Sequence, residues 1–341
     1  MLKQLPCKQH VSLMAGLLML AVTLPAAQPP AQIQITGADL FAAQLPKVPA
    51  LIPVHRVPGG APMNPTVNPQ DIPVVPPPGF YPADVSNPFG GSTLDNFVTH
   101  NIFVNPLNPA PGIYAQSPTG PTLSDSDKFL TSLYGSSFIH LMDQYTGDPA
   151  SVRTVGQGGV ITFNTYRTTY YDQELAILVH AAARTFGGGK GQLLNLFFRQ
   201  GTDICSTFGG ALTNIACYSP DNFSTFVFCA FHDTIDFADL GTVVYSIEPY
   251  ENTPGCRVPQ GSPNGRAVDS MANVLSHEVF EAMSDPLLDS WFNNFSGGEI
   301  GDLCAGRVAN TNLNGSVYQI QAEYSNQYHA CAFTSFSAPP I

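Results

Sequence analysis

Charged side chains are scarce in this sequence of 341 residues, and basic ones are the scarcest. Asp, Glu, Lys and Arg make up 11% of the chain, against a usual share of about 25%. The 13 basic residues face 25 acidic ones, which gives a formal net charge of −12. Binding to nucleic acid or to an anionic membrane surface needs clustered Lys and Arg, so we expect neither. A disordered polyelectrolyte is also excluded, because 44% of the residues are apolar.

No apolar run is long enough to cross a bilayer, which takes about 20 residues. The longest run, residues 11–24, follows Lys3 and Lys8 and precedes the small residues Ala26 and Ala27. This order of charge, apolar run and small residues is typical of a secretory signal peptide; a short buried helix is the alternative. We therefore predict a signal peptide over residues 1–28. The mature chain would be secreted, extracellular or periplasmic, with no membrane contact after cleavage.

Cysteine is sparse too, with seven residues in the chain. One of them, Cys7, lies in the predicted signal peptide, which leaves an even number in the mature chain. An even number in an exported chain indicates disulfides, although the sequence alone does not fix the pairing. We expect neighbours along the chain to pair: Cys205 with Cys217, Cys229 with Cys256, and Cys304 with Cys331.

Proline divides the chain into two regions. Residues 29–121 hold 20 of the 31 prolines and few charges, which predicts a Pro-rich extended arm. This arm is either a flexible stalk or packed on the main domain, and its apolar residues favour packing, with a strand near 97–104. Residues 122–341 are expected to form a single mixed α/β (α+β) domain.

Sequence patterns place the main elements of that domain. Apolar residues at helical spacing, with capping residues before them and Gly or Pro after them, predict helices. Alternating β-branched and aromatic residues predict strands. The expected helices start near 124, cover 137–145 and 173–186, and end with a long one over 269–284; the expected strands cover 159–171, 225–231, 242–247 and 316–324.

The long helix carries the strongest chemical signal. His277 and Glu281 are four residues apart and share one helix face, and more carboxylates follow close behind. An imidazole together with several carboxylates is a donor set that divalent metals accept. The predicted ligands are His277, Glu281, Asp285, Glu299 and Asp302, with His232 as an additional candidate. The alternative is a structural role, with His277 in the core, Glu281 on a solvated face and Asp285 capping a turn.

The spacing also resembles the H-E-x-x-H helix of zinc peptidases. In those enzymes the first His binds zinc and the following Glu is the general base that activates the metal-bound water. Here Glu281 stands where the second His would be, and Glu278 takes the position of the base. A carboxylate-rich site shifts the preference toward harder ions, so zinc and calcium are both candidates. The expected architecture is zincin-like, with the long helix packed under a sheet.

From about residue 225 onward the chain resembles the EXORDIUM / phosphate-induced protein 1 family of secreted proteins. The matching pieces are Phe228-Cys229 with His232, Pro263-Asn264-Gly265, His277-Glu278 with Glu281, Asp285-Pro286, Trp291, Glu299 to Cys304, Gln319 to Tyr324, and Cys331. Asp285 departs from the Asn of the plant pattern. The resemblance implies a cell-wall or extracellular protein and does not imply a particular reaction.

Two functions are compatible with these patterns. The first is a secreted metal-binding protein that acts as a metal-dependent, peptidase-like hydrolase, with Glu278 as the base. The second is a non-catalytic extracellular or cell-wall binding or assembly protein, in which Glu281, Asp285, Glu299 and Asp302 form a structural metal site. The corresponding partner would be a peptide or a cell-wall component.

Overall fold

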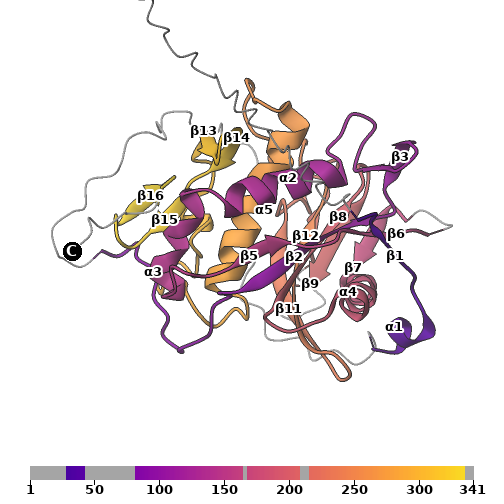
Figure 1. The fold of residues 1–341 in the computed structure, drawn as a ribbon, viewed down its shortest axis with the longest axis horizontal. Helices are drawn as coiled ribbons and strands as arrows, with labels where there is room; N and C mark the ends of the chain where they lie inside the picture. The colour runs from indigo at the N-terminus through magenta and orange to yellow at the C-terminus, as the bar shows by residue number, and fades with distance from the viewer. Residues whose placement is uncertain (1–27, 43–80, 164–166, 208–214, 335–341) are drawn as a thin grey trace, which may run out of the picture.

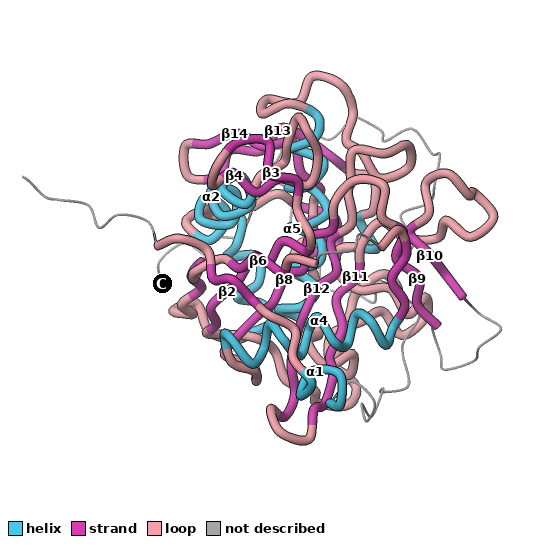
Figure 2. The backbone as a smooth tube through the Cα atoms, turned by 90° about the vertical axis from the view of Figure 1, so that its right-hand side faces the viewer, coloured by secondary structure: helices cyan, strands magenta, loops and turns pink. Residues whose placement is uncertain are grey.

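A computed structural model describes residues 28–42, 81–163, 167–207 and 215–334. The predicted signal peptide, apart from its last residue, lies outside the described residues, and so do residues 43–80 of the predicted arm. In the described part, a central sheet of seven strands has helices on both faces (Figure 1, Figure 2). The expected mixed α/β (α+β) class is confirmed.

The central sheet is almost entirely parallel. From one edge to the other its strands are β1 (Ala31–Ile33), β6 (Gly159–Ile161), β2 (Phe97–Val104), β8 (Gln192–Phe198), β12 (Gly241–Glu248) and β11 (Phe231–Phe237), and β5 (Arg153–Val155) pairs with β2. Only β11, at one edge, is antiparallel to its neighbour. Parallel strands covered on both faces need nearly continuous apolar runs, and β8 has six buried residues in succession.

The sheet includes strands from the region predicted to be an arm. β2 lies in the middle of the sheet and β1 at an edge, so the boundary expected at residue 122 does not coincide with a boundary of the sheet. The physical reason is that residues 97–104 contain no proline and bury side chains on both faces, with Phe97 and Phe103 on one and Ile102 and Val104 on the other. The strand expected near 97–104 is confirmed.

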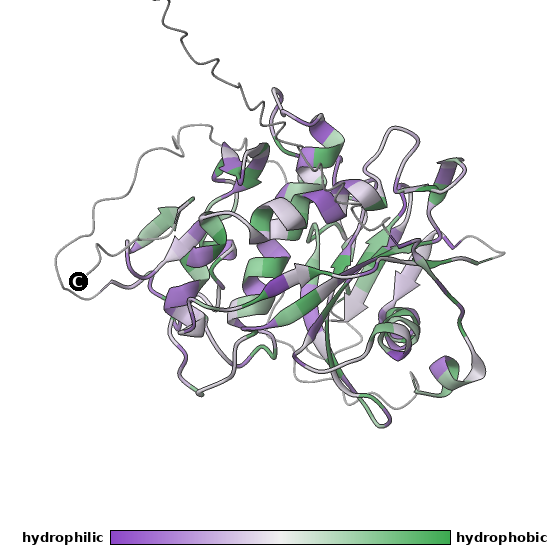
Figure 3. Cartoon of the chain, viewed as in Figure 1, coloured by the Kyte–Doolittle hydropathy of each residue, from purple (hydrophilic) through white to green (hydrophobic). Residues whose placement is uncertain are grey.

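Two apolar cores separate the sheet from its helices. On one face lie α2 (Leu123–Tyr134) and α5 (Arg266–Ser284), which pack against Phe103 and Phe197. On the other face lie α4 (Asp172–Phe186) and the short α1 (Gly37–Ala42). Figure 3 shows hydrophobic residues concentrated along the central strands. The sheet is therefore the middle layer of the domain, and α5 is buried along almost its whole length.

Local signals fix the helix ends. Thr122 caps α2 through a reciprocal pair of hydrogen bonds with Asp125, two residues before the expected cap at Ser124. Helix α4 stops at Gly187, whose φ of 98° suits glycine. Helix α5 ends at Ser284, as predicted from Pro286 two residues later.

Smaller elements surround this frame. The strands are β3 (Leu107–Ala110) with β4 (Ile113–Ala115), β7 (Thr169–Tyr171) with β9 (Asp203–Thr207) and β10 (Ile215–Tyr218), β13 (Val308–Leu313) with β14 (Ser316–Gln321), and β15 (Glu323–Ser325) with β16 (Ala330–Ala332). The short helices are η1 (Phe138–Met142), α3 (Asp143–Thr146) and η3 (Asp302–Cys304). The helical segment expected over 137–145 is confirmed by η1 and α3.

Three expected strands differ from the structure. The strand expected at 225–231 lies at 231–237 instead, because Cys229 belongs to a loop that is tied to Cys256. The segment expected as one strand over 159–171 forms β6 and β7, which belong to different sheets. The segment over 316–324 is divided at Ala322 into β14 and β15.

All three expected disulfides are present. Cys205 pairs with Cys217, Cys229 with Cys256, and Cys304 with Cys331. Disulfides of this kind are typical of chains that mature in an oxidising, exported environment. Among the described residues, no helix has the length and apolar character needed to span a membrane.

Candidate metal centre

Helix α5 carries the H-E-x-x-E residues into the interior of the domain. His277, Glu278 and Glu281 have relative exposures of 5%, 4% and 0%, so none of them lies on a solvated face. The structural alternative in which Glu281 points to solvent is therefore wrong. Buried carboxylates are costly unless they are paired or bind a cation, so the partners of these side chains decide what the site can do.

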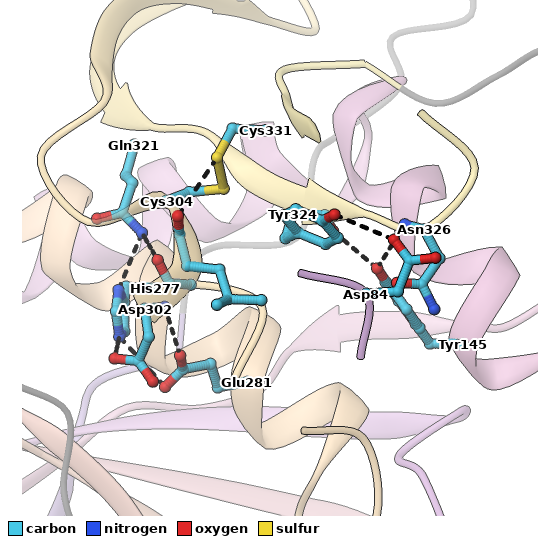
Figure 4. Close-up of a disulfide and its surroundings, with 12 residues drawn as sticks. Asp84, Tyr145, His277, Glu281, Asp302, Cys304, Gln321, Tyr324, Asn326 and Cys331 are labelled. Atoms are coloured by element: carbon cyan, nitrogen blue, oxygen red, sulfur yellow. Dashed lines mark hydrogen bonds and ion pairs between the residues drawn. A yellow bond between two sulfur atoms is a disulfide. The ribbon is translucent and has the colours of Figure 1, made fainter. Parts of the chain in front are cut away.

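His277 contacts Glu281 one helical turn further on. Its Nε2 lies 3.2 Å from Glu281 Oε2 and 3.8 Å from Asp302 Oδ1. The backbone N–H of Asp302 donates to Glu281 Oε1 over 3.0 Å. On the other side of the ring, Gln321 Nε2 lies 3.0 Å from His277 Nδ1, and Figure 4 shows these four side chains together. Helix α5, η3 and β14 thus converge on one imidazole–carboxylate pair.

His232, on edge strand β11, reaches the same carboxylates from the sheet. Its Nδ1 lies 3.5 Å from Glu278 Oε2 and 3.8 Å from Glu281 Oε2, and its Nε2 lies 3.7 Å from Glu299 Oε1. Its Nε2 is also 3.2 Å from the backbone carbonyl of Asp285. His232, the candidate ligand from outside helix α5, therefore lies among the same carboxylates as His277, and its side chain is 2% exposed.

Three groups of side chains in the described residues are spaced closely enough to hold a metal ion, and two of them include Glu281. One group consists of His277, Glu278 and Glu281, and the other of His232, Glu281 and Glu299. A third close group combines Glu251 with Cys229 and Cys256, but these cysteines form a disulfide and offer no thiolate. The candidate metal centre therefore consists of the two groups that share Glu281.

Asp285 and Asp302 have mainly backbone partners. Asp285 Oδ1 accepts hydrogen bonds from the N–H groups of Asp289 and Ser290, both at 2.7 Å, and it caps the turn after α5. Asp302 Oδ2 accepts from the N–H of Glu299 at 2.9 Å. Neither carboxylate belongs to the two close groups, although Asp302 borders His277.

Three further buried carboxyl groups surround the centre, and the sequence reasoning missed them. Glu248 ends β12, Glu251 follows that strand, and Glu323 begins β15; each is at most 1% exposed. Within the part of the chain that the structure describes, both carboxyl oxygens of Glu251 and of Glu323 lack a hydrogen-bond partner. A signal was present, because each is a lone acid in or next to an apolar strand segment. Only the tertiary fold shows that they face the same cluster.

The pKa values follow from burial and crowding. Burial raises the pKa of Glu248, Glu251 and Glu323 well above the usual range of a carboxyl group, and neighbouring carboxylates raise it further. Burial disfavours the charged form of His232, but the carboxylates of Glu299, Glu278 and Glu281 outweigh it and raise the His232 pKa to about 10. The pKa of His277 is raised well above normal by the same balance of causes. Without a metal, this cluster retains protons that a cation would displace.

A row of polar side chains crosses the sheet and ends at His232. Asn101 on β2, Asn195 on β8, Ser246 on β12 and His232 on β11 occupy directly opposite register positions on adjacent strands. Asn195 donates to Asn101 Oδ1 and accepts from Ser246 Oγ, both at 3.0 Å. The Ser246 hydroxyl also lies 2.7 Å from Glu248 Oε1. The sheet therefore holds His232 and Glu248 on the face that α5 covers.

A small cavity adjoins the centre. It leaves about 10 Å³ for the centre of a water molecule, which is roughly the space of one water. Its lining includes His277, Glu278, Asn273 and Gln321. Glu278 thus borders space for about one water molecule.

The fold and the site together define a disulfide-bonded α+β protein with a buried His/Glu centre that could hold a metal ion. Among proteins of known description, the chain is similar to "Protein EXORDIUM-like 5" of Arabidopsis thaliana, with 35% identity over 65 residues. The matched region covers 18% of this chain and 18% of that protein. No family model and no solved structure matches the chain. The similarity supports a relation to EXORDIUM-like proteins over that stretch.

Proposed function

We propose that this chain is an exported protein that binds a divalent cation between helix α5, strand β11 and the segment 299–302. The observation that carries the proposal is the excess of buried acid. Seven carboxyl groups gather around two imidazoles: Glu248, Glu251, Glu278, Glu281, Glu299, Asp302 and Glu323 around His232 and His277. A buried carboxylate without compensation is strongly destabilising, and a divalent cation supplies that compensation.

The donor set favours zinc over calcium. Calcium takes oxygen ligands, whereas zinc accepts imidazole nitrogen together with carboxylate oxygen. Zinc–ligand bonds of about 2.0–2.1 Å place the ligands of a tetrahedral site about 3.3–3.4 Å apart. The distances from the two imidazoles to Glu278, Glu281 and Glu299 are 3.2–3.8 Å, close to that spacing. Small movements of the side chains would bring them into contact with one ion.

Export is supported by three independent features. The first residues have the composition of a signal peptide, and the three disulfides require an oxidising compartment. The resemblance of residues from about 225 onward to the EXORDIUM family implies a role in the extracellular space or cell wall. A peptide or a cell-wall component is the partner that these features favour.

A metal-dependent hydrolase is the second candidate, and the cavity beside Glu278 favours it. A general base must lie within hydrogen-bond reach of the water it activates, and this cavity has space for one water next to Glu278 and His277. A carboxylate-rich metal site raises the pKa of bound water relative to a site with three histidines. Hydrolysis would therefore depend strongly on Glu278.

Elemental analysis of the purified, disulfide-intact protein tests the metal proposal. About one zinc per chain is expected in the wild type and none in Glu281→Gln, while Glu174→Gln, a half-buried change on α4 on the opposite face of the sheet, keeps the metal. A wild-type chain without bound zinc, after dialysis against micromolar zinc, would remove the proposal. Peptidase activity that survives Glu278→Gln at full metal loading would exclude Glu278 as the base.

A further inference from the structure

We infer that His232 on β11, and not His277 on the H-E-x-x-E helix, supplies the nitrogen ligand of the cation. His277 is instead a positioning residue that donates a hydrogen bond to Glu281. This inference rests on the proposed function, since it presupposes that the cluster binds a cation. It reverses the roles that the comparison with zinc-peptidase helices assigns, and it follows from the hydrogen-bond partners of the two rings.

The backbone determines where the proton of neutral His232 lies. The carbonyl oxygen of Asp285, 3.2 Å from His232 Nε2, can only accept a hydrogen bond. In the neutral ring Nε2 therefore carries the hydrogen, and the lone pair is on Nδ1. That lone pair faces the carboxylate oxygens of Glu278 at 3.5 Å and Glu281 at 3.8 Å. A cation that displaced the proton of His232 would therefore find the Nδ1 lone pair beside two carboxylates.

The ring of His277 has the opposite arrangement. Gln321 Nε2 lies 2.8 Å from the carbonyl oxygen of Gly301, which fixes the orientation of the amide, and 3.0 Å from His277 Nδ1. The amide nitrogen therefore donates to both acceptors, so in the neutral ring Nδ1 carries no hydrogen and Nε2 carries one. That Nε2–H points at Glu281 Oε2, 3.2 Å away. The nitrogen that would face a metal is thus already used as a hydrogen-bond donor.

The two hydrogen bonds to Glu281 explain what His277 does. His277 holds Oε2 of this carboxylate, and the backbone N–H of Asp302 holds Oε1 at 3.0 Å. Glu281 is thereby fixed in the position from which it contacts His232. Residues that orient a metal ligand in this way change affinity by about 10–100-fold when they are replaced.

The sheet makes His232 a rigid ligand. It lies opposite Ser246 in the fully paired β11–β12 ladder, at the end of the polar row that begins at Asn101. A ligand on a strand is held more accurately than one on a loop. In its neutral form His232 therefore combines a lone pair on Nδ1, two nearby carboxylates and a fixed backbone.

Four variants separate a ligand from a positioning residue. Glutamine can donate to Glu281 and accept from Gln321, as neutral His277 does, but its amide nitrogen has no lone pair for a metal. Zinc affinity is measured by competition with a chromogenic chelator for His277→Gln, His277→Ala, His232→Gln and His232→Ala. We expect His277→Gln to stay within about tenfold of the wild type and His277→Ala to weaken binding by about 10–100-fold. Both His232 variants should lose stoichiometric zinc.

The outcomes distinguish this inference from the proposed function. Loss of zinc in His277→Gln, with zinc retained in His232→Gln, would overturn the assignment of the ligand, and equal loss in both would overturn the positioning role. A wild-type chain that binds no zinc would remove the proposed function itself. If the His232 variants fail to fold, ¹⁵N NMR of the wild-type histidines is decisive. Zinc should shift His232 Nδ1 and leave His277 protonated on Nε2, and the reverse shift would overturn the inference.

Discussion

Asn195 accepts a hydrogen bond from Ser246 across the middle of the central sheet, over 3.0 Å between Oδ1 and Oγ. Both side chains are completely buried, between Phe197 and Val244 on the same face of the sheet. Asn195 also donates to Asn101, and Ser246 is bonded to Glu248. A polar row in such a core is stable only if each member has its partners. We interpret it as the support that fixes the sheet side of the candidate metal centre.

Replacing Asn195 with leucine should disrupt this row. Asn101 Oδ1 would lose its donor while remaining buried, which costs about 1–3 kcal/mol. Urea denaturation should show that loss in the free energy of unfolding, together with weaker zinc binding. The matched control is Asn310→Leu on the exposed face of β13, which should stay within about 0.5 kcal/mol. An Asn195 variant as stable as the control would show that the row contributes nothing.

Gly301 offers a second test, because the centre leaves no room for a side chain there. A Cβ at this position would lie 2.8 Å from both His277 Nδ1 and Glu281 Oε1. Its φ of −72° is accessible to alanine, so a clash and not backbone strain would cause any effect. We expect Gly301→Ala to displace the imidazole–carboxylate pair and to weaken zinc binding by at least about tenfold.

Gly298 supplies the control for this clash. A Cβ at Gly298 would meet its nearest atoms, in Asp302 and Ser296, at 3.4 Å, an ordinary contact. Gly298→Ala should therefore keep the zinc affinity of the wild type, as measured with the same competing chelator. Equal affinities for the two alanine variants would argue that the metal does not lie near His277 and Glu281.

The sequence predicted the parts of the site that depend on local pattern. The spacing of His277 and Glu281 and the stop at Pro286 are properties of one helix, and the helix lies where they indicate. The carboxylates of Glu248 and Glu323 were missed, because only strand register and tertiary packing bring them beside α5. His232 was proposed as a ligand, but just after the strand expected at 225–231; the structure places it on β11, because the apolar residues before Cys229 belong to a loop.

The elements of the fold that depend on tertiary packing were also missed. The central parallel strand β8 was not predicted, because a short apolar run such as Leu193–Phe198 fits a buried helix as well as a buried strand. The arm was separated from the domain on the basis of its prolines, yet β2 pairs with both β6 and β8. Composition averages over a region, whereas eight residues free of proline are enough for a core strand.

The disulfide between Cys304 and Cys331 should matter for the centre as well as for stability. It joins η3, which begins with Asp302, to β16, the partner of the strand that carries Glu323 (Figure 4). Replacing both cysteines with alanine opens a loop with a sequence separation of 27 residues, worth about 4 kcal/mol in the chain-entropy model. We also expect zinc affinity to fall, because the segment that holds Glu299 and Asp302 loses its tether.

The pair Cys205 and Cys217 separates these two effects. It joins β9 to β10 with a sequence separation of 12, and its removal should cost about 3 kcal/mol. Thermal denaturation should show both double variants to be destabilised, while chelator competition should show weaker binding only without Cys304–Cys331. Equal zinc affinity in the two variants would contradict a role for this tether.

Asp127 should give the domain a measurable pH dependence. This side chain of α2 accepts a hydrogen bond from Asn101 at 2.8 Å, and burial raises its pKa from 3.8 to about 6 against the opposing effect of that hydrogen bond. Between pH 4 and pH 6 the folded chain therefore binds more protons at Asp127 than the unfolded chain does. The contribution of Asp127 to the free energy of unfolding falls as pH rises through this window, by on the order of 2–3 kcal/mol, and is level above it.

Asp127→Asn isolates this contribution, because asparagine keeps the acceptor for Asn101 and does not titrate. The buried acids Asp233 and Asp285, whose pKa values are raised to about 7 and about 6, titrate in both proteins and cancel in the difference. Urea denaturation at a series of pH values should show the variant gaining stability relative to the wild type from pH 4 to pH 6, with a constant difference above pH 6. If the difference in the free energy of unfolding between variant and wild type does not depend on pH, Asp127 ionises as easily in the folded chain as in the unfolded one. Its carboxylate would then be solvated in the folded chain.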